Sequence, residues 1–155
     1  MEIIKKKNNK KKYRIGYTQG VYDLFHIGHL NLLLHAKEQC QYLIVGVNSD
    51  ELVRVYKKKI PVINEEDRYR IIENLKVVDE VVIVSTLDKK ALWEELRFDV
   101  VFIGDDWKGN PRWERTQIEL SNVGVDVVFL PHTENISSTL LRLEKENAIK
   151  DGLEE

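Results

Sequence analysis

The chain has 155 residues, the length of one domain, and its 43% hydrophobic and 32% charged residues are typical of a globular protein with an ordinary core. Its 24 basic and 26 acidic residues give a net charge of −2, which gives no reason to expect nucleic acid as the main partner. The single cysteine, Cys40, excludes an internal disulfide and a cysteine zinc cluster. Because no apolar run is long enough to span a bilayer, we expect no membrane association and a cytoplasmic location.

Residues 1–12 form a lysine-rich leader without the apolar segment of a signal peptide. Such an arm can bind RNA or acidic lipid, but a solvated and poorly ordered leader is the simpler interpretation. Residues 145–155 are a charged tail. The sequence therefore predicts one domain over residues 13–144.

Residues 19–29 connect a short β-rich run to apolar positions at helical spacing, so they are expected to link a first strand to a first helix. In an α/β sheet this loop lies at the carboxyl edge, where ligands bind. Gly20 permits close approach of a ligand, and Gly28 leaves the helix start, with its phosphate-binding N–H groups, uncrowded. His26 and His29 are three residues apart, so both are expected to donate to one phosphate chain. Two ordinary surface histidines, or a metal pair without obvious further ligands, are the alternatives.

Strands and helices alternate along the rest of the chain, which predicts a doubly wound α/β fold with helices on both faces of a parallel sheet. A basic loop that ends at Pro61 is expected over residues 53–61, and Gly124 is expected to cap the helix formed by residues 113–122. The five expected strands are residues 14–18, 42–47, 80–84, 99–103 and 125–130.

Three further loops at strand ends carry groups suited to phosphate or metal chemistry. The lysine run of residues 57–59 either neutralises triphosphate charge or is a solvated turn. Asp105 and Asp106 are candidates for metal ligands, general bases or plain turn residues. The hydroxyl residues in the segment 131–139 are either an ordinary helix cap or an anion site.

The motif G-V-Y-D-L-F-H-I-G-H resembles the HxGH signature of the cytidylyltransferase family of nucleotidyltransferases. The likeness extends from about residue 13 to 142: V-I-N-E-E-D-R-Y and V-V-D-E-V-V are similar to the phosphocholine branch, and G-D-D-W followed by a glycine is similar to the glycerol-3-phosphate branch. The last motif, H-T-E-N-I-S-S-T, resembles R-T-E-G-I-S-T-T. Here His132 replaces an arginine and Asn135 a glycine, which bears on how firmly the nucleotide is held and on which nucleotide is preferred.

The resemblance implies a Rossmann-like HxGH nucleotidyltransferase that moves a cytidylyl group from CTP to glycerol-3-phosphate or a similar polyol phosphate and releases pyrophosphate. It implies Mg²⁺ carried by the triphosphate, with no protein side chain assigned as a ligand, and a homodimer with a contact near residues 77–82. The alternatives are the same chemistry with ATP or with a phosphocholine, phosphoethanolamine or sugar-phosphate acceptor, and a non-catalytic nucleotide-binding regulator.

The resemblance also assigns roles to residues. His26 and His29 are expected to be catalytic together with Lys58, which alignment by eye favours over Lys57. The expected nucleotide-binding residues are Gly20, Val21, Tyr22, Asp23, Gly28, Asp105, His132, Thr133, Ser137, Ser138 and Thr139. The expected acceptor-binding residues are Gln19, Lys57, Arg68, Asp106 and Trp107. A neutral amide at Gln19 suits a polyol better than a quaternary cation.

Overall fold

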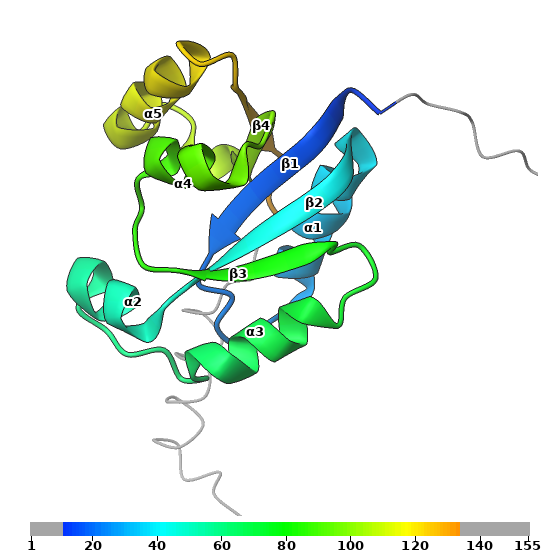
Figure 1. The fold of residues 1–155 in the computed structure, drawn as a ribbon. Helices are drawn as coiled ribbons and strands as arrows, with labels where there is room; N and C mark the ends of the chain where they lie inside the picture. The colour runs from blue at the N-terminus through cyan, green and yellow to red at the C-terminus, as the bar shows by residue number, and fades with distance from the viewer. Residues whose placement is uncertain (1–10, 134–155) are drawn as a thin grey trace, which may run out of the picture.

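The computed structural model describes residues 11–133, and Figure 1 shows their arrangement. Five parallel strands form one sheet in the order β3-β2-β1-β4-β5. This confirms the predicted doubly wound five-stranded parallel sheet. The strands are β1 (Tyr13–Gly20), β2 (Cys40–Asn48), β3 (Glu80–Val84), β4 (Val100–Gly104) and β5 (Asp126–Leu130).

Helices cover both faces of the sheet (Figure 1), because each face carries its own apolar cluster. Helices α1 and α3 contribute buried Leu33 and Ile72 to one cluster, and α4 and α5 contribute Leu92 and Trp113 to the other. The helical elements are α1 (Ile27–Gln39), α2 (Asp50–Lys57), α3 (Glu65–Glu73), α4 (Lys89–Leu96), the short 3₁₀ helix η1 (Asp105–Trp107) and α5 (Pro111–Ser121). No helix in this described part of the chain has the length and apolar character needed to cross a membrane.

Helix α2 corrects the prediction of a basic loop over residues 53–61, because residues 53–57 are helical. The Leu52 N–H donates to Ser49 Oγ at 3.1 Å, and two acidic residues in the first turn favour the helix start. Val53 is buried and anchors the helix. In the sequence, the lysine run that follows this short amphipathic segment favoured the interpretation as a loop.

Helix α5 also differs from its prediction at both ends. It begins at Pro111, directly after Asn110, whose side chain caps it. The regular helix ends at Ser121, one residue before the predicted end. The predicted role of Gly124 is confirmed, because with a φ of 77° it closes the helix in a Schellman motif, in which the Gly124 N–H donates to the Ser121 carbonyl oxygen at 3.1 Å and the Val125 N–H to that of Leu120 at 2.9 Å.

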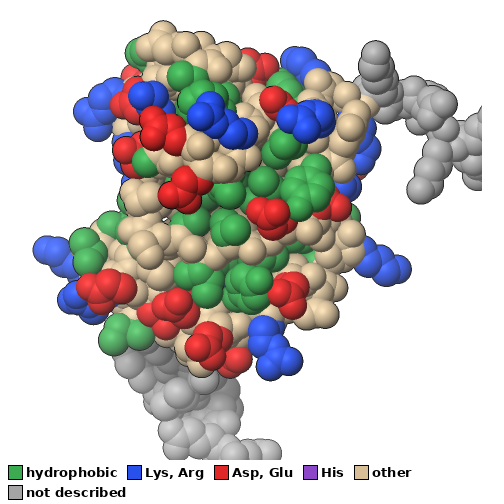
Figure 2. Space-filling model, in the orientation of Figure 1, with side chains coloured by type: hydrophobic (Ala, Val, Ile, Leu, Met, Phe, Trp, Pro, Cys, Tyr) green, Lys and Arg blue, Asp and Glu red, His purple; other side chains and the backbone are tan. Residues whose placement is uncertain are grey.

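Strand β3 forms one edge of the sheet, and Figure 2 shows hydrophobic and acidic side chains close together on the face that carries it. Ile83 on β3 and Tyr42 on the neighbouring β2 are each about two-fifths exposed (40% and 38%). The homodimer expected through the adjacent segment 77–82 stays a prediction.

The parallel register brings the carboxyl ends of the strands to one edge. Thr18 of β1 is paired with Val45 of β2 and with Phe102 of β4, and Gly104 at the end of β4 is paired with Leu130 at the end of β5. The loops that follow these strands therefore meet, although they are far apart in the sequence.

Candidate active site

A cavity of about 400 Å³ opens at the carboxyl edge of the sheet. All four segments that were predicted to hold the site contribute to its wall. The predicted site residues that line it are Gln19, Gly20, Val21, Tyr22, Asp23, His26, Gly28, His29, Lys57, Asp106, Trp107, His132 and Thr133. Lys58, Arg68 and Asp105 do not line it, and Ser137, Ser138 and Thr139 lie outside the described residues.

The two histidines of the motif form the start of α1. His26 is the N-cap, and the Gly28 N–H donates to its Nδ1 at 3.0 Å. The backbone N–H of His26 donates in turn to Nδ1 of His29 at 3.2 Å. The two rings stack with their centroids 3.8 Å apart. Since each Nδ1 accepts a hydrogen bond, each neutral ring carries its proton on Nε2.

Both rings are neutral at physiological pH. Burial lowers the pKa of His26, and burial together with the neighbouring His26 lowers the pKa of His29 to about 4, against the opposing effect of Asp23. The rings of Tyr22 and Phe25 lie 5.5 and 5.4 Å from that of His29, centroid to centroid, and hold it in place. The pair therefore offers Nε2–H donors rather than cations.

The backbone between β1 and α1 is strained. Tyr22 and Leu24 have φ values of 56° and 51°, which residues with side chains rarely adopt. Such conformations persist where the surroundings hold them, often at functional sites. A Cβ at Gly20 would lie 3.0 Å from the Tyr22 ring, so a side chain at this position would crowd the tyrosine.

Asp23 ties this loop to the segment after the lysines. Its carboxylate is buried, with 3% of the residue exposed, and accepts the Val62 N–H at 2.8 Å and the Ile63 N–H at 3.0 Å. This clamp helps to place Ile60 and Pro61 on the cavity wall, where the sequence had not predicted them. These two hydrogen bonds join residues that are separated by 39 and 40 positions in the chain, and no local sequence pattern indicates such contacts.

The lysine run presents alternate members to the cavity. Lys57 and Lys59 line it, whereas Lys58, the C-cap of α2, is exposed and does not. Lys58 has left-handed backbone angles (φ 54°, ψ 37°), so the chain turns there and its neighbours face the cavity. The structure thus does not bring the expected catalytic Lys58 to the site. Its rival Lys57 is there, with Nζ 5.7 Å from the centre of the Tyr56 ring.

Arg68 lies inside the protein and not in the cavity, so we withdraw the prediction of an acceptor contact. It is 1% exposed, and its guanidinium donates to the carbonyl oxygens of Ile63, Val21 and Asn48 at 2.7–2.8 Å. It also pairs with Asp50 Oδ1 at 2.6 Å. All these partners are structural, so Arg68 joins three loops beneath the site.

Gln19 is held by a directed chain of hydrogen bonds. Its Nε2 donates to Asn48 Oδ1 at 2.9 Å and to the Thr86 carbonyl oxygen at 3.0 Å, and its Oε1 accepts from the Tyr17 hydroxyl at 2.8 Å. Asn48 Nδ2 donates onward to the Tyr56 hydroxyl at 3.0 Å. Because a carbonyl can only accept, the amide orientation is fixed. Gln19 has only an acceptor lone pair left for a substrate.

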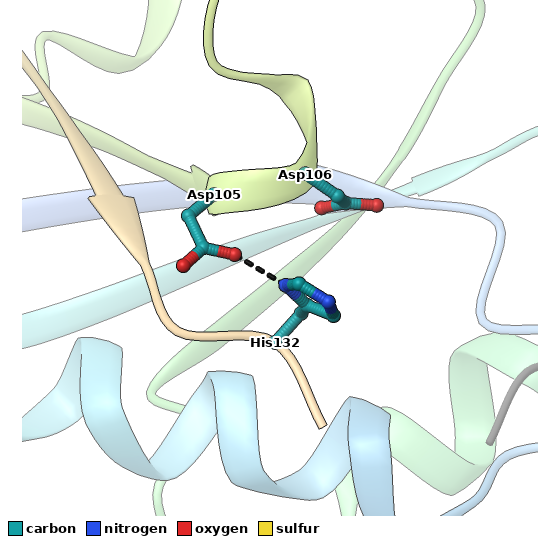
Figure 3. A group of neighbouring side chains, drawn as sticks. All are labelled: Asp105, Asp106 and His132. Carbon is teal, nitrogen blue, oxygen red and sulfur yellow. Dashed lines mark hydrogen bonds and ion pairs between the residues drawn. The ribbon is translucent and has the colours of Figure 1, made fainter. Parts of the chain in front are cut away.

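Asp105, Asp106 and His132 gather where η1 meets the segment after β5, as Figure 3 shows. The Asp105 carboxylate is hydrogen-bonded to His132 Nδ1, and this contact lowers the pKa of Asp105. One ligand atom from each of the three exposed residues lies within 4.8 Å of the others. Nearby, Asn31 Nδ2 donates to Thr133 Oγ1 at 3.0 Å and joins this segment to α1.

The cytidylyltransferase-like family matches residues 17–144, most of the chain. The chain belongs to this family. It is 37% identical over 128 residues to a glycerol-3-phosphate cytidylyltransferase of Bacillus subtilis, which covers 82% of this chain and 93% of that relative. It is 35% identical over 128 residues to an FAD synthase of Thermococcus onnurineus, which covers 81% and 84%.

A solved structure supports the same assignment. The lipopolysaccharide core biosynthesis protein of Thermoplasma volcanium has a TM-score of 0.67 at 27% identity, over 80% of this chain and 99% of that protein. The predicted membership of the cytidylyltransferase-like family and the predicted enzyme of the nucleotidyltransferase class are confirmed. The relatives carry two different names, glycerol-3-phosphate cytidylyltransferase and FAD synthase.

Proposed function

We propose that this member of the cytidylyltransferase-like family transfers a cytidylyl group from CTP to a small phosphorylated alcohol, with glycerol-3-phosphate as the first candidate, and releases pyrophosphate. The supporting relatives are the Bacillus subtilis enzyme and a glycerol-3-phosphate cytidylyltransferase of Staphylococcus aureus, 34% identical over 82% of the chain. The observation that carries the proposal is that two neutral histidine donors and two lysines line one cavity.

The reaction is a direct displacement at phosphorus. An oxygen of the acceptor phosphate attacks the α-phosphorus of CTP, the bond from that phosphorus to the bridging oxygen breaks, and pyrophosphate leaves with the electron pair. The Nε2–H groups of His26 and His29 donate to phosphate oxygens as charge builds up on them. Lys57 and Lys59 supply positive charge between two anions that must approach within about 3–3.5 Å.

Neutral donors suit this chemistry because they need no proton uptake. An imidazole with a lowered pKa keeps its Nε2–H, and its Nδ1 keeps the hydrogen bond that holds the ring. The cationic charge is then supplied by the two lysines that line the cavity. The two tasks, hydrogen-bond donation and charge neutralisation, are divided between separate side chains.

We propose that Mg²⁺ arrives with the nucleotide. Mg²⁺ prefers oxygen ligands in octahedral geometry, and the cluster of two carboxylates with an imidazole is a poor match, since His132 already engages Asp105. When bound to the triphosphate, the ion neutralises part of its charge. Asp106, which lines the cavity, is the carboxylate best placed to approach such an ion.

A second candidate is the same displacement with ATP. It is favoured by the FAD synthases among the relatives, such as that of Korarchaeum cryptofilum, 36% identical over 123 residues. FAD contains an adenylyl group. The histidine at position 132, in place of the family's arginine, also bears on nucleotide choice because it replaces a fixed cation with a smaller ring.

Pyrophosphate release separates these candidates. The purified protein would be assayed with Mg²⁺ and either CTP or ATP, each combined with glycerol-3-phosphate, FMN or a sugar 1-phosphate. We expect CTP with glycerol-3-phosphate to give a kcat/KM at least about tenfold above any other pair. A higher value for ATP with FMN would favour the second candidate, and a nucleotide that binds without turnover would indicate a regulator. The His29→Ala variant, purified in the same way, controls for contaminating activity.

A further inference from the structure

Arg112, which no sequence motif indicates, is not part of the cavity lining but lies directly against Trp107, which is. It is the second residue of α5, and its guanidinium carbon is 5.4 Å from the centre of the Trp107 ring. Trp107 lines the cavity and is 38% exposed. A cation–π contact with an aromatic face restrains an arginine and leaves its N–H groups available to other partners.

Within residues 11–133, Arg112 forms no ion pair and its side chain donates no hydrogen bond to protein. The positive charge beside Trp107 is that of the Arg112 guanidinium and does not come from free N–H groups at the start of α5. The backbone N–H groups of Arg112 and Trp113 already donate to Asn110 Oδ1 at 3.0 and 3.4 Å. A half-buried guanidinium without a carboxylate is able to receive an anion from outside the chain.

The charged groups around Arg112 include further cations. Lys89 is 6% exposed, and burial, followed by the charge of Arg112, lowers its pKa to about 8 against the opposing effect of Asp88. Arg112 also acts electrostatically on Tyr56, the residue whose ring carries the Lys57 ammonium. Arg112 therefore has a cationic neighbour in Lys89, whose charge Asp88 only partly offsets, and this arrangement favours an anionic ligand near Arg112.

We propose that Arg112 binds the phosphate of the acceptor substrate at the Trp107 end of the cavity, with Lys57 between this phosphate and the nucleotide. The inference rests on the proposed function, which requires two anionic substrates in one site. A planar guanidinium matches two oxygens of a phosphomonoester with two parallel hydrogen bonds. The ligand class is a phosphomonoester dianion, a group that glycerol-3-phosphate and FMN share, so the assignment holds for either nucleotide.

The test compares Arg112→Gln and Arg112→Lys with Arg97→Gln. Arg97 stacks on Trp93 at 4.4 Å but precedes β4, at the opposite edge of the sheet, so it is a matched arginine–tryptophan pair away from the cavity. We expect Arg112→Gln to raise the KM for the acceptor by about 10- to 100-fold, the size of a lost pair of charge-assisted hydrogen bonds. The KM of Arg112→Gln for CTP should stay within about twofold of the wild-type value. The KM of Arg112→Lys for the acceptor should lie between those of the wild type and Arg112→Gln. Arg97→Gln should have the wild-type KM for both substrates.

Equilibrium binding of glycerol-3-phosphate without nucleotide, measured by calorimetry or NMR, separates this inference from the proposed function. Weaker binding by Arg112→Gln than by the wild type supports the role of Arg112 even where no nucleotide is turned over. Equal binding by the two proteins, no binding by the wild type, or a raised KM for CTP alone would overturn it. Matching urea unfolding midpoints for the wild type, Arg112→Gln and Arg112→Lys confirm that the comparison is between folded proteins.

Discussion

Protonation of His29 should destabilise the protein as the pH falls. Its pKa is about 4 in the folded chain, lowered by burial and by His26, and returns to about 6.5 on unfolding. The unfolded state therefore binds more protons between these values, and the stabilisation present above pH 6.5 is lost as the pH approaches 4. At about 1.4 kcal/mol for each pH unit, we expect a loss of about 2 kcal/mol of unfolding free energy by pH 5 and about 3 kcal/mol by pH 4.

The assay combines urea unfolding at pH 7, 6 and 5 with ¹⁵N NMR of the four imidazoles. The His29→Asn variant assigns the resonance and supplies a control, since its amide oxygen can replace Nδ1 as the acceptor for the His26 N–H. The variant should lose about 2 kcal/mol less stability than the wild type between pH 7 and 5. Both motif histidines should show the Nε2–H tautomer.

A His29 pKa near 6.5, or an Nδ1–H tautomer in either ring, would refute the reasoning. The donor to phosphate would then be an imidazolium or the wrong nitrogen. The capping geometry at the start of α1 would no longer explain the chemistry.

The remaining predictions concern the lysine run, the buried arginine and assembly. Lys57→Ala and Lys59→Ala should each lower kcat about 10²-fold, with the KM for CTP little changed, whereas Lys58→Ala should stay within about threefold; uniformly small effects in steady-state kinetics would indicate a solvated turn. Arg68→Met should lower the free energy of urea unfolding by about 3–5 kcal/mol, because it leaves the Asp50 charge and three carbonyls without their donor. Arg54, which is exposed and ion-paired, supplies the control: Arg54→Met should change the free energy of unfolding by less than about 1 kcal/mol. An unchanged urea midpoint for Arg68→Met would contradict the expectation. Light scattering at micromolar concentration should give the mass of a homodimer paired near the β3 edge, and a monomer mass would exclude it.

The sheet and the convergence of four segments were predictable, because alternating strands and helices force a parallel sheet whose strand ends share one edge. The histidine pair was predictable for a local reason: three residues of helical spacing bring the rings of His26 and His29 together. These features depend on short-range periodicity, which a single sequence carries.

The rest depended on contacts between distant positions or on one backbone angle. The turn at Lys58 reverses which lysines face the cavity, and nothing in a run of three lysines indicates a left-handed residue. Arg68 looked like a helix-surface cation, but its partners come from three other segments. The clamp from Asp23 to Val62 and Ile63 likewise exists only once the chain has folded.

The hydrogen-bond chain through Gln19 constrains how this enzyme can acquire new acceptors during evolution or design. A carboxylate at position 19, the simplest route toward a cationic acceptor, would have no proton for the Thr86 carbonyl, so it would lose that hydrogen bond and set oxygen against oxygen at the end of β1. It would also require the Asn48 amide to rotate, so that Nδ2 donates to the carboxylate and Oδ1 accepts from the Tyr56 hydroxyl, the reverse of the present direction. A change of acceptor preference at position 19 therefore reverses the polarity of the whole chain, and a library should vary positions 19, 48 and 56 together.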